Sequence, residues 1–151
     1  MCPSAELIEP CRCVNYGLEP NGTMWLNCNR LNLIDEEISQ ILNTFIENCK
    51  NISLLRQLTA ISNFLTRIPL EVRYFPGLRV LNFHDNRISL IKKDDFKFNT
   101  FMRTTGDYDQ HVLLYLDNNM IDHIEPGAFE GKFYIHVFLH YNKIINYRHR
   151  R

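Results

Sequence analysis

One pattern of apolar and polar positions recurs along the chain. Each copy centres on an asparagine, with apolar residues three and five positions before it and another two positions after it. Four segments carry the pattern clearly: LRQLTAISNFL around Asn63, LRVLNFHDNRI around Asn86, HVLLYLDNNMI around Asn119 and YIHVFLHYNKI around Asn142. A fifth, degenerate copy, TMWLNCNRL, is centred on Asn29. This recurrence predicts a fold built from repeated units.

Within each copy the spacing indicates a short strand. Apolar residues alternate with outward positions at a period of two, so they point to one side of a strand. We expect the strands to stack into a parallel sheet, with each asparagine bonding backbone groups at the turn that leaves its strand. Asn119 should therefore lie inside the molecule. A single unit cannot bury its own apolar side, so the ends need caps.

The stretches between the copies predict further elements. Successive asparagines lie 34, 23, 33 and 23 residues apart, so two of the four intervals carry extra residues. The first excess predicts an amphipathic helix over 36–49 on the convex side, capped by Asp35, because apolar residues follow at helical spacing. The second excess, 97–110, contains the turn-forming run Thr104-Thr105-Gly106-Asp107 and predicts a protruding loop.

These elements together predict an α/β fold. The pattern matches the L-x-x-L-x-L-x-x-N-x-L signature, so we expect a leucine-rich-repeat solenoid with a short parallel sheet on its concave side. Residues 1–33 would form a cysteine-rich N-terminal cap and residues 34–151 the repeats. No cysteine-rich C-terminal cap follows, and the chain stops inside a copy at a basic run, 148–151, which we interpret as a solvated end. We therefore expect a truncated C-terminus.

Composition and charge narrow the class of partner. Seventeen Lys and Arg residues are balanced by seventeen Asp and Glu residues. A neutral chain has no electrostatic reason to bind nucleic acid or an anionic membrane. No window approaches the ~20 apolar residues that a membrane helix needs. We expect neither a nucleic-acid partner nor a membrane span.

Four of the five cysteines lie within the first 28 residues. Cys2, Cys11, Cys13 and Cys28 have the spacing C-x8-C-x-C-x14-C, which differs from the C-x2-4-C pairs of zinc sites. In an extended segment, Cys11 and Cys13 point to opposite faces, which favours two disulfides over one metal ion. The sequence leaves three pairings open. Cys49 is the odd thiol, either buried and free, or paired with a residue in a missing C-terminal part or with another chain.

Clustered cysteines predict an oxidising, extracellular setting. Two sequons point the same way and make Asn21 and Asn51 candidate glycosylation sites. No signal sequence precedes Cys2, so we expect the N-terminus to be mature, trimmed or truncated.

The opening CPSAELIEPCRC, followed by MWLNC, resembles the cysteine-rich N-terminal flank of extracellular leucine-rich-repeat proteins. The resemblance implies that Cys2 pairs with Cys13 and Cys11 with Cys28. The same opening, the 36–49 helix and the IEPGAF segment are similar to a narrower group of secreted arthropod proteins, typified by the non-catalytic subunit of Oplophorus-luciferin 2-monooxygenase. That similarity implies a secreted, non-enzymatic accessory subunit or scaffold.

Outward strand positions are unusually rich in aromatic and apolar side chains. Such side chains are typical of protein interfaces. Tyr115 and Phe138 share one slot in adjacent copies, and Trp25 takes that slot in the cap strand. The alternative is that a neighbouring segment, such as the 97–110 loop, covers this surface. The predicted partner-binding residues are Val80, His84, Leu113, Tyr115, Asp117, His136, Phe138, His140 and Tyr141.

A further row, His84, Asp117 and His140, offers groups that hold metal ions or act as acid and base. No nucleophile elbow, phosphate loop or H-E-x-x-H motif accompanies it. We therefore expect no metal, cofactor or catalysis, and predict a secreted protein that binds a protein partner. Two alternatives stay open: recognition of a microbial or glycan ligand, and a hydrolase or oxidase that uses the His/Asp row.

Overall fold

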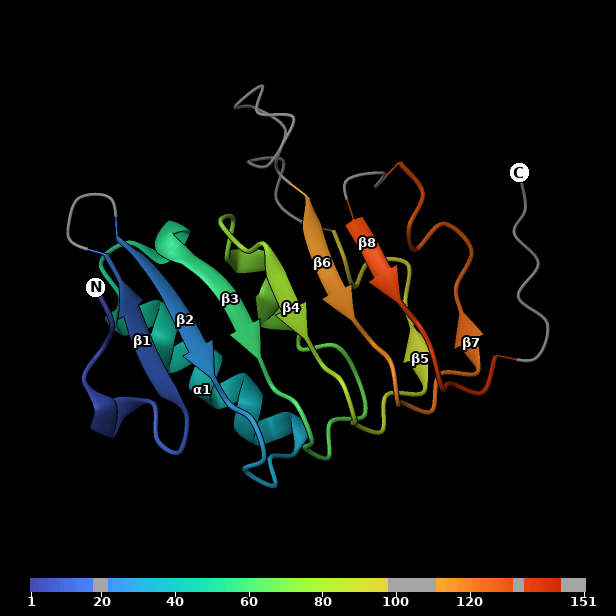
Figure 1. Cartoon of the computed structure of the whole chain (residues 1–151), viewed down its shortest axis with the longest axis horizontal. Helices are drawn as coiled ribbons and strands as arrows, with labels where there is room; N and C mark the ends of the chain where they lie inside the picture. The colour runs from blue at the N-terminus through green and yellow to red at the C-terminus, as the bar shows by residue number, and fades with distance from the viewer. Residues whose placement is uncertain (18–21, 98–110, 132–134, 145–151) are drawn as a thin grey trace.

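The computed structural model describes residues 1–17, 22–97, 111–131 and 135–144 (Figure 1). Across these residues, six strands form one sheet in the order β1-β2-β3-β4-β6-β8, and two short strands, β5 and β7, form a second. One α-helix and three 3-10 helices complete the described elements. The bounds are η1 Ala5–Leu7, β1 Arg12–Tyr16, β2 Thr23–Asn27, α1 Asp35–Asn48, η2 Ile52–Leu54, β3 Leu55–Thr59, η3 Leu70–Tyr74, β4 Val80–Asn82, β5 Leu90–Ile91, β6 Val112–Tyr115, β7 His123–Ile124 and β8 Ile135–Phe138.

The larger sheet is mixed but mostly parallel. Strand β1 pairs with β2 in antiparallel fashion, and every later neighbour pair, from β2·β3 to β6·β8, is parallel. The chain returns to the same end of the sheet after each parallel strand, through the segments that carry α1, η3, β5 and β7 (Figure 1). The α/β class and the parallel sheet predicted from the sequence are confirmed, with one antiparallel strand added at the N-terminal edge.

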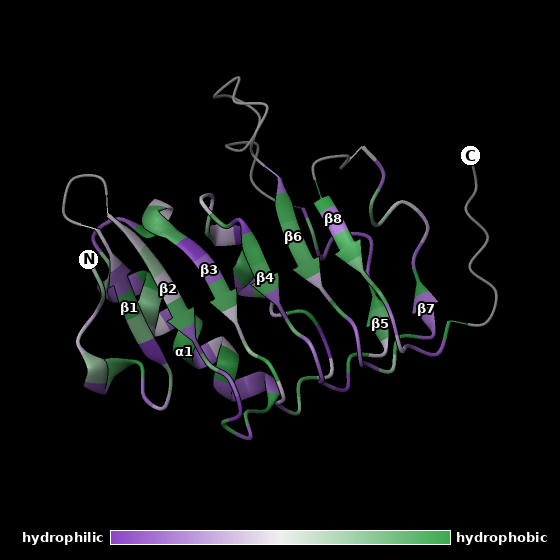
Figure 2. Ribbon diagram, in the orientation of Figure 1, coloured by the Kyte–Doolittle hydropathy of each residue, from purple (hydrophilic) through white to green (hydrophobic). Residues whose placement is uncertain are grey.

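A row of central apolar side chains holds the sheet to the core. The strand register places Leu26, Leu58, Leu81 and Leu114 side by side, and each is fully buried. Because alternate residues of a strand point to opposite faces, their neighbours lie on the other side of the sheet. Figure 2 shows the hydrophobic residues concentrated on the strands and the hydrophilic ones along many of the connections.

The predicted helix is present as α1 and covers the back of the N-terminal strands (Figure 1). Its apolar side, which includes Ile38, Leu42 and Phe45, is buried in the same cluster as the strand residues. The predicted cap is wrong: Ile34 is the N-cap, and its backbone N–H donates to the Glu37 carboxylate at 3.1 Å. Asp35 is the first helical residue, and its carboxylate instead accepts the backbone N–H of Thr66 at 2.9 Å.

The implied cysteine pairing is confirmed. One disulfide joins Cys2 to Cys13, with Cα atoms 5.7 Å apart, and the other joins Cys11 to Cys28, with Cα atoms 4.5 Å apart. The second disulfide ties the start of β1 to the end of β2 from within the core. Cys49 follows α1, is half-buried and forms no disulfide within the described chain.

Four asparagines occupy equivalent places in the turns that leave the strands. The Asn119 side chain is buried, accepts the Ile88 N–H at 3.0 Å and donates to the carbonyls of Phe83 and Leu116 at 3.0 and 3.1 Å. These partners lie in its own turn and in that of the preceding strand, so the amide links neighbouring copies. The prediction for Asn119 is confirmed. Bonds of the same kind are made by Asn63, Asn86 and Asn142.

The predicted alignment of the first, degenerate copy on Asn29 is wrong by two residues. Leu26 pairs with Leu58 and Asn27 with Thr59, which places Leu31 beside Asn63. Asn29 therefore lies two residues before the asparagine slot, where its side chain accepts the Ile61 N–H at 2.9 Å. The first copy has a leucine in place of the linking asparagine, and it receives its bond from Asn63, whose Oδ1 accepts the Leu31 N–H at 3.0 Å.

Three expectations concern residues outside those described: the 97–110 loop apart from Lys97, the sequon residue Asn21 and the 148–151 tail. In the part of the chain that the structure describes, no helix is long and apolar enough to cross a membrane.

Candidate functional site: the open face of the sheet

The sheet has one face that packs on α1 and the core, and a second, which we call the open face. Strand register arranges the open-face side chains in rows that run across the strands. The first row is Trp25, Gln57, Val80, Leu113 and His136. The second is Asn27, Thr59, Asn82, Tyr115 and Phe138.

An apolar and aromatic patch occupies the C-terminal part of these rows. Tyr115 and Phe138 are paired neighbours, and their rings stack with centroids 4.6 Å apart and planes 9° apart. Leu113 pairs with Val80 on one side and His136 on the other. We call Val80, Leu113, Tyr115, His136 and Phe138 the aromatic patch. The first three and Phe138 are half-buried and His136 is exposed, so each side chain presents some of its surface to solvent.

The sequence predicts that Trp25 takes the same slot as Tyr115 and Phe138, and this prediction is wrong. Trp25 pairs with Gln57 and so belongs to the row of Val80 and Leu113, because the first copy is shifted by two residues. Its indole N–H donates to Thr59 Oγ1 at 2.9 Å, and its ring stacks with Tyr16 at 6.5 Å. Its polar atom is thus satisfied within the chain.

His111 joins the patch and was not among the sequence candidates. It lies two residues before Leu113 and therefore on the same face. Its Nδ1 is 3.0 Å from Nε2 of His136, and the two rings are 4.8 Å apart. The same alternation that predicts Leu113 on this face also predicts His111 there, although His111 lies just before the residues of the repeat pattern.

The His/Asp row is brought together only in part. His84 Nδ1 lies 2.6 Å from Asp117 Oδ2. The backbone N–H of His84 donates to Asn82 Oδ1 at 3.0 Å. The other carboxylate oxygen, Asp117 Oδ1, is buried and has no hydrogen-bond partner among the described residues. His140 is exposed and occupies the next position in the row, as the backbone bond from Asn118 to His140 shows.

This row has the groups for proton transfer but lacks the rest of a catalytic or metal site. A histidine bonded to a carboxylate can act as a general base. Within the described ranges, no hydroxyl or thiol is hydrogen-bonded to the His84 ring. Among the same residues, no group of three or more His, Cys, Asp or Glu side chains is arranged to hold a metal ion.

Tyr141 is the last of four residues that have a positive φ at equivalent positions in successive copies. The residue just before each linking asparagine has a positive φ, 56° at Tyr141 and 58° at Asp85. Asp and Asn tolerate this left-handed region, whereas an aromatic residue does so at a cost. Tyr141 is also 81% exposed. Tyr141 therefore carries a backbone cost at an exposed position, three residues after Phe138 in the sequence.

Comparison of the sequence with protein-family models and with curated proteins finds no match.

Proposed function

We propose that the chain is an extracellular leucine-rich-repeat solenoid that binds a protein partner through the aromatic patch. The open face would be the concave side of the solenoid, and the partner would cover Tyr115, Phe138, Leu113 and the flanking histidines. The stacked Tyr115–Phe138 pair carries the proposal, because it exposes aromatic surface on a rigid strand framework.

The repeat architecture is supported by the linking asparagines. Asn63, Asn86, Asn119 and Asn142 each bond the backbone of their own turn and that of the preceding copy. Such bonds between successive turns are what a stack of identical units requires, since each unit touches mainly its neighbours.

The extracellular setting is supported by the two cap disulfides, which persist in oxidising compartments. It is supported further by the sequon at Asn51, an exposed residue whose Oδ1 accepts the Ser53 N–H at 3.2 Å while the side chain faces solvent. We expect Asn51 to accept a glycan.

A protein partner is supported by the mixture of side chains on the patch. Aromatic rings bury a large area at low cost in conformational entropy, and they concentrate in the energetically dominant parts of protein interfaces. The exposed imidazoles of His111 and His136 supply polar atoms at its edge. An apolar centre with a polar rim is the usual anatomy of such an interface.

The proposal is tested by capturing partners from native secretions with the immobilised protein, identifying them by mass spectrometry and measuring the affinity of the recombinant pair. Tyr115→Ala and Phe138→Ala should each weaken binding by about 1–3 kcal/mol. Gln57→Ala, on the same face in the N-terminal half, is the matched control and should bind as the unmodified protein does. Lost stability with unchanged affinity would show that another segment covers the patch. Recovery of an enzyme would make the chain an accessory subunit.

A second candidate function, hydrolysis by the His84–Asp117 pair, has the 2.6 Å contact between Nδ1 and Oδ2 in its favour. It requires that His84→Ala abolish turnover of an ester or peptide substrate while His140→Ala leaves it unchanged. Absence of turnover by the unmodified protein across a substrate panel would dismiss it.

A further inference from the structure

Two histidine side chains meet at the edge of the open face. His111 directly precedes β6, and His136 is the second residue of β8. Nδ1 of His111 lies 3.0 Å from Nε2 of His136, and the ring centroids are 4.8 Å apart with the planes inclined by 57°. Both side chains are exposed. Two nitrogens that can each offer a lone pair therefore lie next to each other within reach of solvent.

The sheet fixes the backbone that carries the two rings. Strands β6 and β8 are paired in parallel, with Leu113 opposite His136. The backbone N–H of Leu113 donates to the carbonyl of Arg79 at 2.8 Å, which ties the start of β6 to the start of β4. Side chains held by strands keep their relative positions better than side chains on loops, so the pair is partly organised before any ligand binds.

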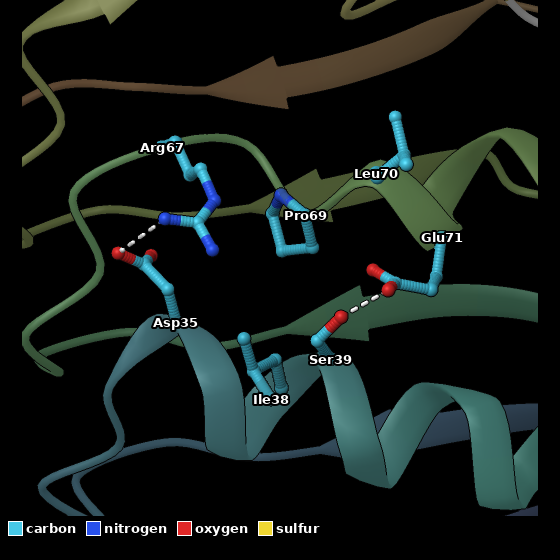
Figure 3. Close-up of a pocket in the computed structure, with 7 residues that line it drawn as sticks. All are labelled: Asp35, Ile38, Ser39, Arg67, Pro69, Leu70 and Glu71. Atoms are coloured by element: carbon cyan, nitrogen blue, oxygen red, sulfur yellow. Dashed lines mark hydrogen bonds and ion pairs between the residues drawn. The ribbon is translucent and has the colours of Figure 1, made fainter.

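Other charged and titratable groups of the described chain already have partners. In the hollow between α1 and η3, the Asp35 carboxylate is paired with Arg67 at 3.4 Å (Figure 3). On the open face, His84 lies 2.6 Å from Asp117. The two exposed rings at the edge contact each other, and within the described residues neither forms a further hydrogen bond or an ion pair. An ion from solution can therefore reach them without displacing a carboxylate.

The separation of the two nitrogens suits a shared metal ion. Nitrogens that each lie about 2.0–2.1 Å from one ion are about 2.9 Å apart at a right angle and about 3.3 Å apart at a tetrahedral angle. The observed 3.0 Å lies between these values. In the neutral pair one nitrogen donates its proton to the other. A metal ion can replace that proton when His111 carries its hydrogen on Nε2 and His136 carries its hydrogen on Nδ1.

We propose that His111 Nδ1 and His136 Nε2 bind one divalent transition-metal ion, and that Cu²⁺ binds most tightly. Imidazole is a ligand for Cu²⁺, Ni²⁺ and Zn²⁺, and the affinity of a given site is highest for Cu²⁺. No group of three or more His, Cys, Asp or Glu side chains that could hold a metal occurs in the described part of the chain, so water completes the coordination. The proposal does not depend on the protein partner, because this chain alone supplies both nitrogens.

The test is a calorimetric titration of the protein with Cu²⁺ in the presence of glycine, which keeps the ion soluble. We expect one saturable site, and weaker binding of Zn²⁺ to the same site. His111→Gln and His136→Gln each remove one of the two nitrogens, and each should weaken Cu²⁺ binding at least about tenfold because a single imidazole cannot chelate the ion. His123→Gln is the matched control: it removes an exposed histidine on β7, in the smaller sheet, and should bind Cu²⁺ as the unmodified protein does.

Two further measurements locate the ion and check the fold. In the ¹⁵N-labelled protein, Zn²⁺ should shift the amide signals of residues 111–115 and 135–138. Glutamine keeps a polar side chain at an exposed position, so the circular dichroism spectra of both variants should match that of the unmodified protein. The absence of a saturable Cu²⁺ site would overturn the proposal, as would unchanged affinity in both variants. An equal loss in His123→Gln would also overturn it, because exposed histidines would then bind Cu²⁺ singly.

Discussion

The N-terminal and C-terminal halves of the six-stranded sheet share one framework and differ in their outward side chains. In the N-terminal half, which contains β1, β2 and β3, two disulfides cross-link the chain and α1 packs against the inward face of the sheet. On the open face of this half, Trp25 is bonded to Thr59 and stacked on Tyr16. Around β6 and β8, the open face instead presents the stacked Tyr115–Phe138 pair.

The inward positions of the two halves are almost interchangeable. Leu26, Leu58, Leu81 and Leu114 form one continuous buried row across both. Packing in the core constrains the inward residues, whereas the outward residues can differ between the two halves without disturbing the core. We therefore propose that the N-terminal half provides stability and that the C-terminal half provides the binding surface. Three substitutions test this division of roles.

Removing the buried disulfide should destabilise the N-terminal half most. The change Cys11→Ala with Cys28→Ala releases a bridge across a sequence separation of 17 residues, so we expect a loss of about 3 kcal/mol in the free energy of unfolding. Urea unfolding followed by circular dichroism measures it. Cys49→Ala, which alters the one cysteine that forms no disulfide, is the control. A loss below about 1 kcal/mol would mean that the cap contributes little to stability.

Asn119→Ala tests the framework that both halves share. The substitution leaves the Ile88 N–H and the carbonyls of Phe83 and Leu116 without this partner, which should cost about 1–3 kcal/mol of stability. The same urea experiment measures the change. Asn48→Ala, at an exposed asparagine in the last turn of α1, should stay within about 0.5 kcal/mol. Equal effects at the two positions would argue against a linking role.

Tyr141→Asn should have the smallest effect on stability and the opposite sign. Asparagine tolerates the φ of 56° better than tyrosine does, so we expect a gain of up to about 1 kcal/mol, together with weaker binding of the partner. Thermal unfolding and the affinity measurement report the two effects. Tyr74→Asn, at an exposed tyrosine in η3, should give no such gain. A stabilised protein with full affinity would remove Tyr141 from the interface.

Much of this arrangement follows from the sequence because it depends on periodicity. The alternation in each copy placed Leu114 inside and Tyr115 outside, and the asparagine motif placed Asn119 in its turn. Matched spacing then made Tyr115 and Phe138 neighbours, as the structure confirms. The cysteine pairing came from a resemblance and is also confirmed.

What the sequence missed depends on departures from the period or on contacts between distant segments. In the first copy Leu31 replaces the linking asparagine, so an alignment on Asn29 slipped by two residues and moved Trp25 into the wrong row. The sequence analysis also missed the buried residue Glu71, whose carboxylate accepts a hydrogen bond from Ser39 Oγ. Ser39 lies 32 residues away on α1, so no local pattern joins the two.

Photo-crosslinking shows whether the C-terminal half of the open face contacts a protein partner, as we propose. The photoreactive residue p-benzoylphenylalanine is placed at position 115 in one variant and at position 25 in another, which puts matched aromatic probes on the same face in the two halves. Each variant is irradiated with the partner captured by the unmodified protein. We predict a crosslink from position 115 and none from position 25. A crosslink from position 25 alone, or equal yields from both, would contradict it.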